Sequence, residues 1–136
     1  MAHYDQHFQY HVFSNSELRD AIFDGCNFSN CSFEGVRLDH TEFIGCHFSN
    51  CNFTGSLVIN TALKEVKFDT CKLLGFDFSA CSDFLFRAGF DNCLLDNALF
   101  NRKNLKNTGF KNSSVREADF NAVELSNASF AGSDLA

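Results

Sequence analysis

The sequence predicts an all-β solenoid, in which short strands follow one another around a coil and each coil stacks on the one before it. Three observations predict this fold class. An apolar residue recurs at every fifth position, a column of small residues lies two positions earlier, and similar segments recur after 20 residues. Because residues two apart on an extended strand point to the same side, both columns face inward.

The apolar column, here called the five-residue lattice, runs through almost all of the 136 residues. Its first part comprises Phe8, Phe13, Leu18, Phe23, Phe28, Phe33, Leu38, Phe43, Phe48, Phe53, Val58, Leu63, Phe68, Leu73 and Phe78. After a failure at Asp83, it continues two residues out of phase with Leu85, Phe90, Leu95, Phe100, Leu105, Phe110, Val115, Phe120, Leu125, Phe130 and Leu135. In a helix, apolar residues recur after three and four positions, and on a flat strand residues five apart point to opposite faces. The pattern therefore excludes both and leaves a coil that turns a corner every five residues.

The other positions of the repeat fit such a coil. The residues two positions before the lattice are mostly Ala, Cys, Thr, Ser or Val, and the two after it are rich in Gly and Asn, which tolerate corner geometry. Residues 23–35 match residues 43–55 at nine of thirteen positions, so four repeats complete one coil. Lys103 is an exception in the small column, where we expect it to snorkel or to distort the coil.

This order of a small residue, a polar residue, Leu or Phe, and two further polar residues resembles that of the pentapeptide repeat proteins. The resemblance covers nearly the whole chain and implies a right-handed quadrilateral β-helix. At four lattice residues per coil we expect about 6.5 coils, in a single domain over residues 1–136. The expected structural core includes Phe23, Phe28, Phe33, Phe43, Phe48, Phe53, Phe68, Phe78, Phe90, Phe100, Phe110, Phe120, Phe130, Cys31, Cys51, Cys71 and Cys93.

Residues 79–87 interrupt the lattice with two extra residues, which a β-helix must extrude as a bulge or a short loop. One interpretation is a simple fault in register. The other is a kink or a recognition element, because functional groups are often carried on irregular segments of regular scaffolds. Phe84 and Phe86 lie off the lattice in this segment. Exposure of either ring would favour a contact site, and burial of both would favour the register fault.

The candidate metal ligands do not form a recognisable metal-binding motif. All seven cysteines lie in or next to the small column, and they are five or more residues apart, unlike zinc ligands. We expect reduced, packed thiols, with disulfides between adjacent coils as the alternative. His3, His7 and His11 have the spacing of a chelating helix, but Phe8 and Phe13 place this segment in the lattice, so we expect solvated side chains. The same holds for His40 and His47, and no metal site is expected.

Charge and targeting features exclude several classes of protein. The formal net charge of −6 is the wrong sign for binding nucleic acid through its phosphates, so no direct nucleic-acid binding is expected. Residues 61–116 carry an excess of three positive charges, and we interpret their cluster of Arg102, Lys103, Lys106, Lys111 and Arg116 as a solvated surface. The chain shows neither a secretory signal nor a long apolar run, which predicts a cytoplasmic protein without membrane association. No phosphate-binding loop, dinucleotide fingerprint or catalytic cleft is recognisable, so we expect neither enzymatic activity nor a cofactor.

Two hypotheses of function remain. A regular solenoid offers long rigid faces, which favours a non-catalytic scaffold that binds a protein partner. The alternative comes from the run Thr41–Phe48 and from the spacing of Phe68, Cys71, Leu73 and Phe78, which resemble the bacterial quinolone-resistance and microcin-immunity pentapeptide repeat proteins. That resemblance implies binding to DNA gyrase or topoisomerase IV, with the acidic rod mimicking duplex DNA and protecting against quinolones or gyrase poisons.

The candidate partner contacts are Asp39, Asp77, Phe84 and Phe86. The two carboxylates would belong to a phosphate-like track, and the two rings to the irregular segment. The sequence stops at Ala136 inside the lattice, without the dimerising helix that the gyrase-directed relatives carry. From this we expect either end-to-end association of copies or a truncated chain.

Overall fold

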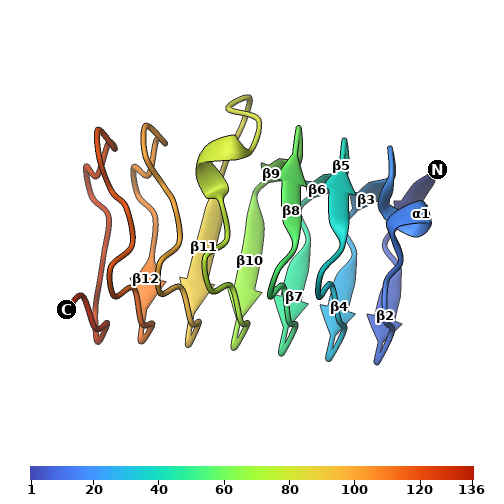
Figure 1. Cartoon of the computed structure of the whole chain (residues 1–136), viewed down its shortest axis with the longest axis horizontal. Coiled ribbons are helices and arrows are strands. Elements are labelled where there is room, and N and C mark those ends of the chain that lie inside the picture. Colours follow the sequence, from blue (N-terminus) through green and yellow to red (C-terminus); the bar gives the residue numbers. More distant parts are fainter.

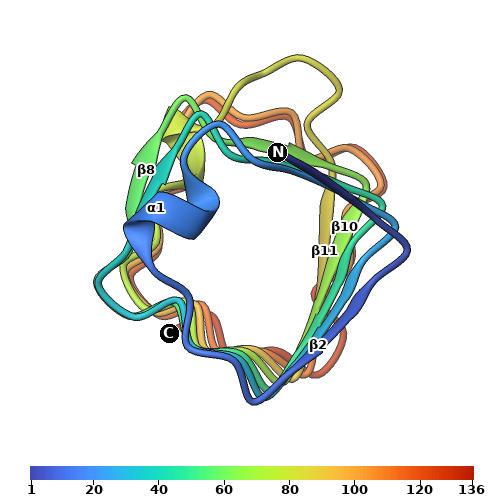
Figure 2. The ribbon, with the colours of Figure 1, turned by 90° about the vertical axis from the view of Figure 1, so that its right-hand side faces the viewer.

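The computed structural model describes residues 1–136 and shows a parallel β-solenoid of about six turns with almost no helix. The two ends of the chain lie at opposite ends of the rod (Figure 1). Viewed along the rod, the coils superpose in a four-sided outline (Figure 2). The fold class predicted from the five-residue lattice is therefore confirmed.

Parallel pairing between coils builds the sides of the rod. One side is a four-stranded sheet in the order β1 (Ala2–Tyr4), β3 (Ile22–Asp24), β6 (Glu42–Ile44), β9 (Ala62–Lys64). The next is a six-stranded sheet in the order β12 (Phe110–Lys111), β11 (Ala88–Asp91), β10 (Val66–Asp69), β7 (His47–Ser49), β4 (Asn27–Ser29), β2 (His7–Gln9). The other two sides hold the pair β5 (Arg37–Asp39) and β8 (Leu57–Ile59), and ladders of single parallel bridges.

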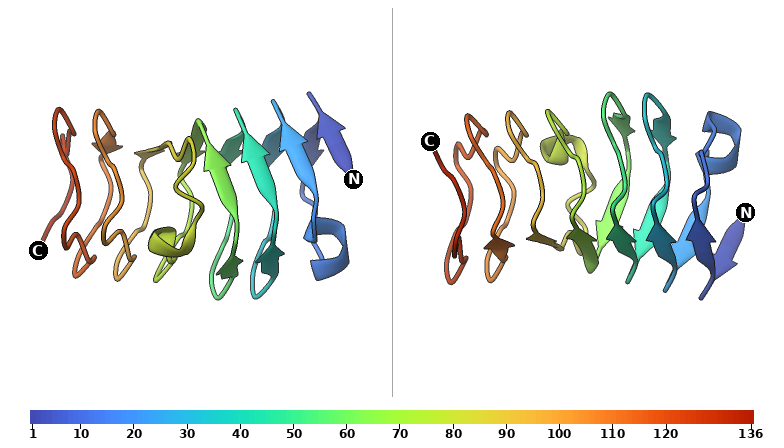
Figure 3. Two further views of the ribbon diagram at one scale, coloured as in Figure 1. Left: turned by 90° about the horizontal axis from the view of Figure 1, so that it is seen from above. Right: turned by 90° about the horizontal axis from the view of Figure 1, so that it is seen from below.

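The register between coils reproduces the period of the sequence. Phe28 pairs with Phe48, and Phe90 with Phe110, each 20 residues apart. Across the interruption Phe68 pairs with Phe90, 22 residues apart. The two extra residues are therefore absorbed between β10 and β11 without displacing the later coils, and Figure 3 shows the stack continuing on both sides of the break.

The corners fall where Gly and Asn were expected. Gly25, Gly45 and Gly75 have positive φ, and so do Asn30 and Asn50. This left-handed conformation is accessible to Gly and better tolerated by Asn than by most other residues. The repeat therefore places residues suited to a left-handed corner at the end of each short strand.

The core is a set of phenylalanine ladders that run along the rod. The Phe48 ring is stacked between Phe28 at 4.7 Å and Phe68 at 5.0 Å, with interplanar angles of 10° and 12°. Rings from neighbouring sides meet edge to face, as Phe43 does with Phe48. The largest buried cluster extends from Phe13 to Val115. Of the expected core residues, Phe120 and Phe130 are only half-buried, because they lie in the last turn of the rod.

All seven cysteines are free and buried. Those at Cys31, Cys51, Cys71 and Cys93 form one column, in which each thiol donates to a main-chain carbonyl of the preceding coil at 3.3–3.4 Å. In the same column the Ser113 hydroxyl accepts from the Cys93 amide at 3.0 Å, and the Ser133 hydroxyl donates to the Phe110 carbonyl at 2.7 Å. This column therefore also bonds each coil to the one before it.

Two short helices depart from the predicted pattern. Helix α1 (Asn15–Leu18) replaces a strand on the first coil, and Ser14 and Glu17 form a reciprocal capping box at its start. The spacing of Ser14 and Glu17 is the sequence signal that identifies this turn. The 3-10 helix η1 (Phe78–Ala80) leads into the interrupted segment. At four and three residues, neither helix approaches the length needed to cross a membrane.

Candidate interaction site

The interruption of the lattice forms a loop that projects from the rod (Figure 2). Pairing with the previous coil holds until the Ser82 amide, which donates to the Thr61 carbonyl at 2.8 Å, and it resumes when the Arg87 amide donates to Leu63 at 3.1 Å. The residues between them, Asp83–Phe86, leave the coil and are closed by a bond from the Phe86 amide to the Asp83 carbonyl at 3.2 Å. We call Asp83–Phe86 the projecting loop.

The tip of the projecting loop is apolar. Phe84 is 68% exposed and Leu85 is 64% exposed, and the Lys64 ammonium lies 5.3 Å from the centre of the Phe84 ring. Leu85 has a φ of 57° and does not enter the core, so the expectation that the lattice resumes at this residue was wrong. Phe86 instead turns inward and packs against the core as a half-buried ring.

Lys103 fixes the base of the projecting loop. Its side chain is 2% exposed, and its ammonium donates to the Cys81 carbonyl and to Asp83 Oδ1, both at 2.6 Å. The same ammonium lies 4.8 Å from the centre of the Phe86 ring. The expectation that Lys103 would snorkel or distort the coil was wrong. Its stem lies inside the rod, and the departure of the loop leaves a carbonyl and a carboxylate that bind its charge.

The two expected acidic contacts are both engaged within the chain. Asp39 is buried, and its carboxylate accepts from Arg37 Nε at 3.0 Å and from Arg37 Nη2 at 3.3 Å. This hydrogen bond with Arg37 holds the pKa of Asp39 below its usual value. Asp77 is half-buried and accepts from the Ser79 hydroxyl. Neither residue presents an unpaired carboxylate at the tip of the projecting loop.

The thiols and the histidines are not assembled into a reactive centre. Burial raises the pKa of the Cys46 and Cys81 thiols to about 12, which keeps them protonated near neutral pH. His3 stacks on Phe23 with ring centres 4.7 Å apart, whereas His11 forms an ion pair with Glu17 at 2.7 Å. No three His, Cys, Asp or Glu side chains are grouped as metal ligands would be.

Sequence reasoning placed Phe84 and Phe86 in the irregular segment but did not identify the residues that hold it. These are Lys64, Asp83 and Lys103. Two signals could have indicated the last two, since Asp83 occupies the position where the lattice fails and Lys103 occupies an inward position one coil later. A carboxylate and an inward lysine 20 residues apart are in register in a coil of this period.

Comparisons with known proteins agree with this architecture. A family model described as pentapeptide repeat region matches residues 21–82, and one described as pentapeptide repeats (8 copies) matches residues 5–35. No curated protein sequence matches the chain.

Solved structures of such proteins are similar to the rod. A trypsin-treated variant of QnrB1, described as a plasmid-mediated fluoroquinolone resistance protein, superposes with a TM-score of 0.58 and 19% identity, over 98% of this chain and 74% of that one. The pentapeptide repeat protein Rfr23 from the cyanobacterium Cyanothece 51142 matches with a TM-score of 0.43 and 13% identity, over 100% and 88%. The five-residue lattice, the stacked four-sided coils and the two family models together show that the chain belongs to the pentapeptide repeat family.

Proposed function

We propose that the protein is a non-catalytic interaction module, in which the solenoid is a rigid scaffold and the projecting loop contacts a protein partner. The observation that carries this proposal is the exposed Phe84 ring on a loop whose base is fixed by the buried Lys103. Aromatic side chains, Phe included, are enriched in the cores of protein interfaces.

Because its base is fixed, the projecting loop should bind a partner more tightly than a mobile loop would. The Lys103 ammonium, the Phe86 ring and the main-chain bonds of Ser82 and Arg87 each restrain a different point of the loop. A contact that is already ordered loses less conformational entropy when it binds. The apolar tip would therefore insert into an apolar pocket of the partner at little ordering cost.

The test is affinity capture with the wild-type protein, with Phe84→Ser and with Leu57→Ser as the control. Leu57 is 52% exposed on β8, so its substitution removes an exposed apolar group elsewhere on the rod. We expect a protein that is retained by the wild type and by Leu57→Ser but is reduced about tenfold or more by Phe84→Ser, as for an interface hot spot. Equal retention by all three proteins would overturn the role of the loop.

A type II topoisomerase is the second candidate partner, and the charge balance of the rod favours it. Six of the seventeen carboxylates take part in ion pairs, and eleven do not, whereas only five Lys or Arg side chains are without such a partner. The rod thus retains a negative electrostatic potential, which would attract a positively charged DNA-binding surface. The alternative from sequence, a DNA mimic that protects gyrase or topoisomerase IV, rests on this charge.

This second candidate is tested by titrating the protein into a gyrase supercoiling reaction, with and without a fluoroquinolone. Inhibition or protection at about 10 µM or below, in the range of specific complexes, is the expected result. It should weaken in Asp77→Asn, which removes a carboxylate that forms no ion pair, but persist in Leu57→Ser. No effect at roughly 50 µM would exclude gyrase and leave the interaction module with another partner.

A further inference from the structure

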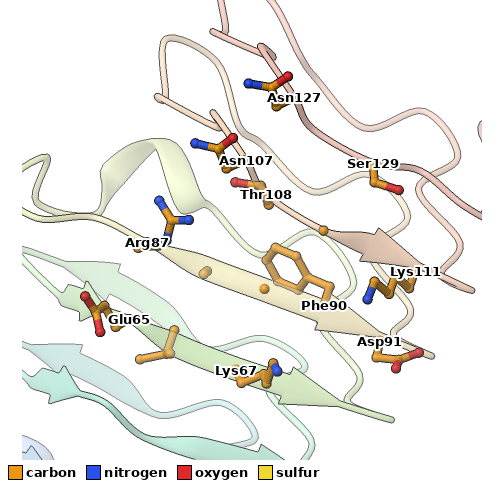
Figure 4. Close-up of a pocket in the computed structure, with 14 residues that line it drawn as sticks. Glu65, Lys67, Arg87, Phe90, Asp91, Asn107, Thr108, Lys111, Asn127 and Ser129 are labelled. Carbon is orange, nitrogen blue, oxygen red and sulfur yellow. The ribbon is translucent and has the colours of Figure 1, made fainter.

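A groove of about 600 Å³ lies across the outer face of β10, β11 and β12, and no residue of the projecting loop lines it. Figure 4 shows the three cations that line it, Lys67 on β10, Arg87 just before β11 and Lys111 on β12. Gly89 and Gly109 also line it, and we call the strand segments at these two glycines its floor. We call this feature the basic groove. Its volume lies within the range of small-molecule sites.

The basic groove exists because glycines occupy two outward positions, and the conformation of the backbone does not require glycine there. In earlier coils the outward position on this sheet carries His7, Asn27, His47 and Lys67, whereas the next two coils carry Gly89 and Gly109. Neither glycine has a positive φ. An added Cβ would meet nothing within 4 Å at Gly89, and only Lys111 Cε at 3.7 Å at Gly109. The fold itself therefore does not require glycine at either position.

The unpaired cations of the protein are concentrated around this floor. Six of the eleven Lys and Arg side chains form ion pairs, and five do not. Three of these five, Lys67, Arg87 and Lys111, line the basic groove, although the protein as a whole carries a formal charge of −6. Lys67 is in register with Gly89, and Lys111 with Asp91.

Two carboxylates also line the basic groove, but they leave a positive balance. They are Glu65 and Asp91, and Asp91 accepts from the Asn112 amide at 3.4 Å. The main chain of the floor is already paired between coils, since the Phe90 amide donates to the Gly109 carbonyl at 2.9 Å and the Phe110 amide to Ser129 at 2.6 Å. Recognition must therefore come from side chains, and three cations against two carboxylates leave a net side-chain charge of +1 in the groove.

We propose that the basic groove binds a small phosphorylated molecule, with its phosphate held by Lys67, Arg87 and Lys111 and its body resting on Gly89 and Gly109. A phosphate group is an anion that these cations attract, and Arg and Lys are the side chains that bind it. The absence of side chains at two successive coils leaves room for a flat body of about nucleoside size. This inference is independent of the projecting loop and its partner.

The experiment is a titration of adenosine monophosphate into ¹⁵N-labelled full-length protein, followed through the amide resonances of the glycines. The chain has eight glycines, so Gly89 and Gly109 give two reporters in an uncrowded region of the spectrum. We expect saturable shifts at these two residues with a dissociation constant of about 0.1 to 1 mM at low salt. Inorganic phosphate alone should bind more weakly at the same residues.

Variants make the result specific. Gly89→Leu should fill the groove without disturbing the rod, because its Cβ has free space, and it should abolish the shift at Gly109. Lys67→Gln and Lys111→Gln should each weaken binding about fivefold or more. Lys72→Gln is the matched control, because Lys72 is also unpaired but lies outside the groove.

Three outcomes would overturn the proposal. They are no saturable shift up to about 10 mM, unchanged binding in a folded Gly89→Leu protein, and an equal loss in Lys72→Gln, which would indicate general charge screening. Tighter binding of a duplex oligonucleotide with the same dependence on variants would assign the groove to a nucleic-acid backbone instead. The thermal midpoint of each variant shows whether it is folded.

Discussion

At the scale of single residues, stacked rings and buried thiols account for most of the interior. Phe48 has no exposed surface and is held between two parallel rings, and Cys51 bonds to the carbonyl of Phe28 in the coil before it. Each such residue contacts its counterparts in both adjacent coils. The loss of one ring therefore removes packing contacts in three coils at once.

Truncation of a ladder ring should be costly. Phe48→Ala removes a fully buried ring and should lower the free energy of unfolding by about 3 to 5 kcal/mol. Asn27→Ala, at an exposed outward position on β4, should change it by less than about 0.5 kcal/mol. Denaturant unfolding followed by circular dichroism measures both. Similar midpoints for the two variants would contradict the inward placement of the lattice.

Alkaline pH should destabilise the protein through its buried thiols. Burial raises the pKa of Cys46 from 9.0 to about 12, so above pH 9 the unfolded chain loses this proton while the folded protein keeps it. The stability that this thiol contributes is therefore fully present below pH 9. It falls toward pH 12, by up to about 1.4 kcal/mol per pH unit for each such thiol.

The measurement is the free energy of unfolding under reducing conditions at several pH values from 8 upward. Cys46→Ala should show a shallower decline than the wild type. Val66→Ala is the steric control, because Val66 lies in the same column without a thiol, and it should keep the wild-type slope. A Cys46→Ala protein with the wild-type slope would show that this thiol is not the titrating group.

At the scale of elements, the interruption between η1 and β11 is a local insertion that the buried lysine accommodates. Lys103→Met retains an apolar stem but removes both hydrogen bonds to the loop. We expect faster chymotrypsin cleavage after Phe84 or Leu85, because the base of the projecting loop is released. Lys106→Met, at an exposed lysine on the following corner, should be cleaved at the wild-type rate. Equal rates for the two variants would argue against the anchoring role.

Removal of the insertion tests the same interpretation from the other direction. Deleting Asp83 and Phe84 restores a 20-residue period and moves Leu85 onto the lattice, but it leaves the Lys103 ammonium without its carboxylate. The deletion alone should therefore destabilise the protein by about 3 kcal/mol, as expected for an unpaired buried charge. Adding Lys103→Ala should restore a thermal midpoint close to that of the wild type. A double variant that stays as unstable as the deletion would show that the loop itself supports the rod.

The regular elements could be predicted from sequence, and the irregular ones could not. The period of five determines which residues face inward, so the pairing of Phe28 with Phe48 and the two-residue shift before Phe90 follow from counting. The choice between Leu85 and Phe86 as the inward side chain does not follow from counting. It depends on the point at which the chain leaves the coil, and that point lies at Asp83, whose carboxylate accepts from Lys103. Helix α1 was missed because a single capped turn keeps Leu18 on the lattice.

At the scale of the whole molecule, the stacked coils place two different surfaces on one rod. The tip of the projecting loop is apolar and exposed, and the basic groove is polar with three unpaired cations. The main-chain bonds between coils continue on both sides of the insertion, from Val66 to Arg87 at 3.0 Å and from Phe90 to Gly109 at 2.9 Å. The rod should therefore behave as one rigid scaffold rather than as two segments joined at a hinge.

Hydrogen exchange of the native protein, resolved by residue, shows whether the solenoid is rigid and presents one fixed loop. We expect slow exchange for the inter-coil amides of Val66, Phe90 and Phe110, with protection close to the global stability, and fast exchange confined to the tip of the projecting loop. Fast exchange that extends from the loop into β10 and β11 would contradict this expectation, because the insertion would then be a break in the scaffold.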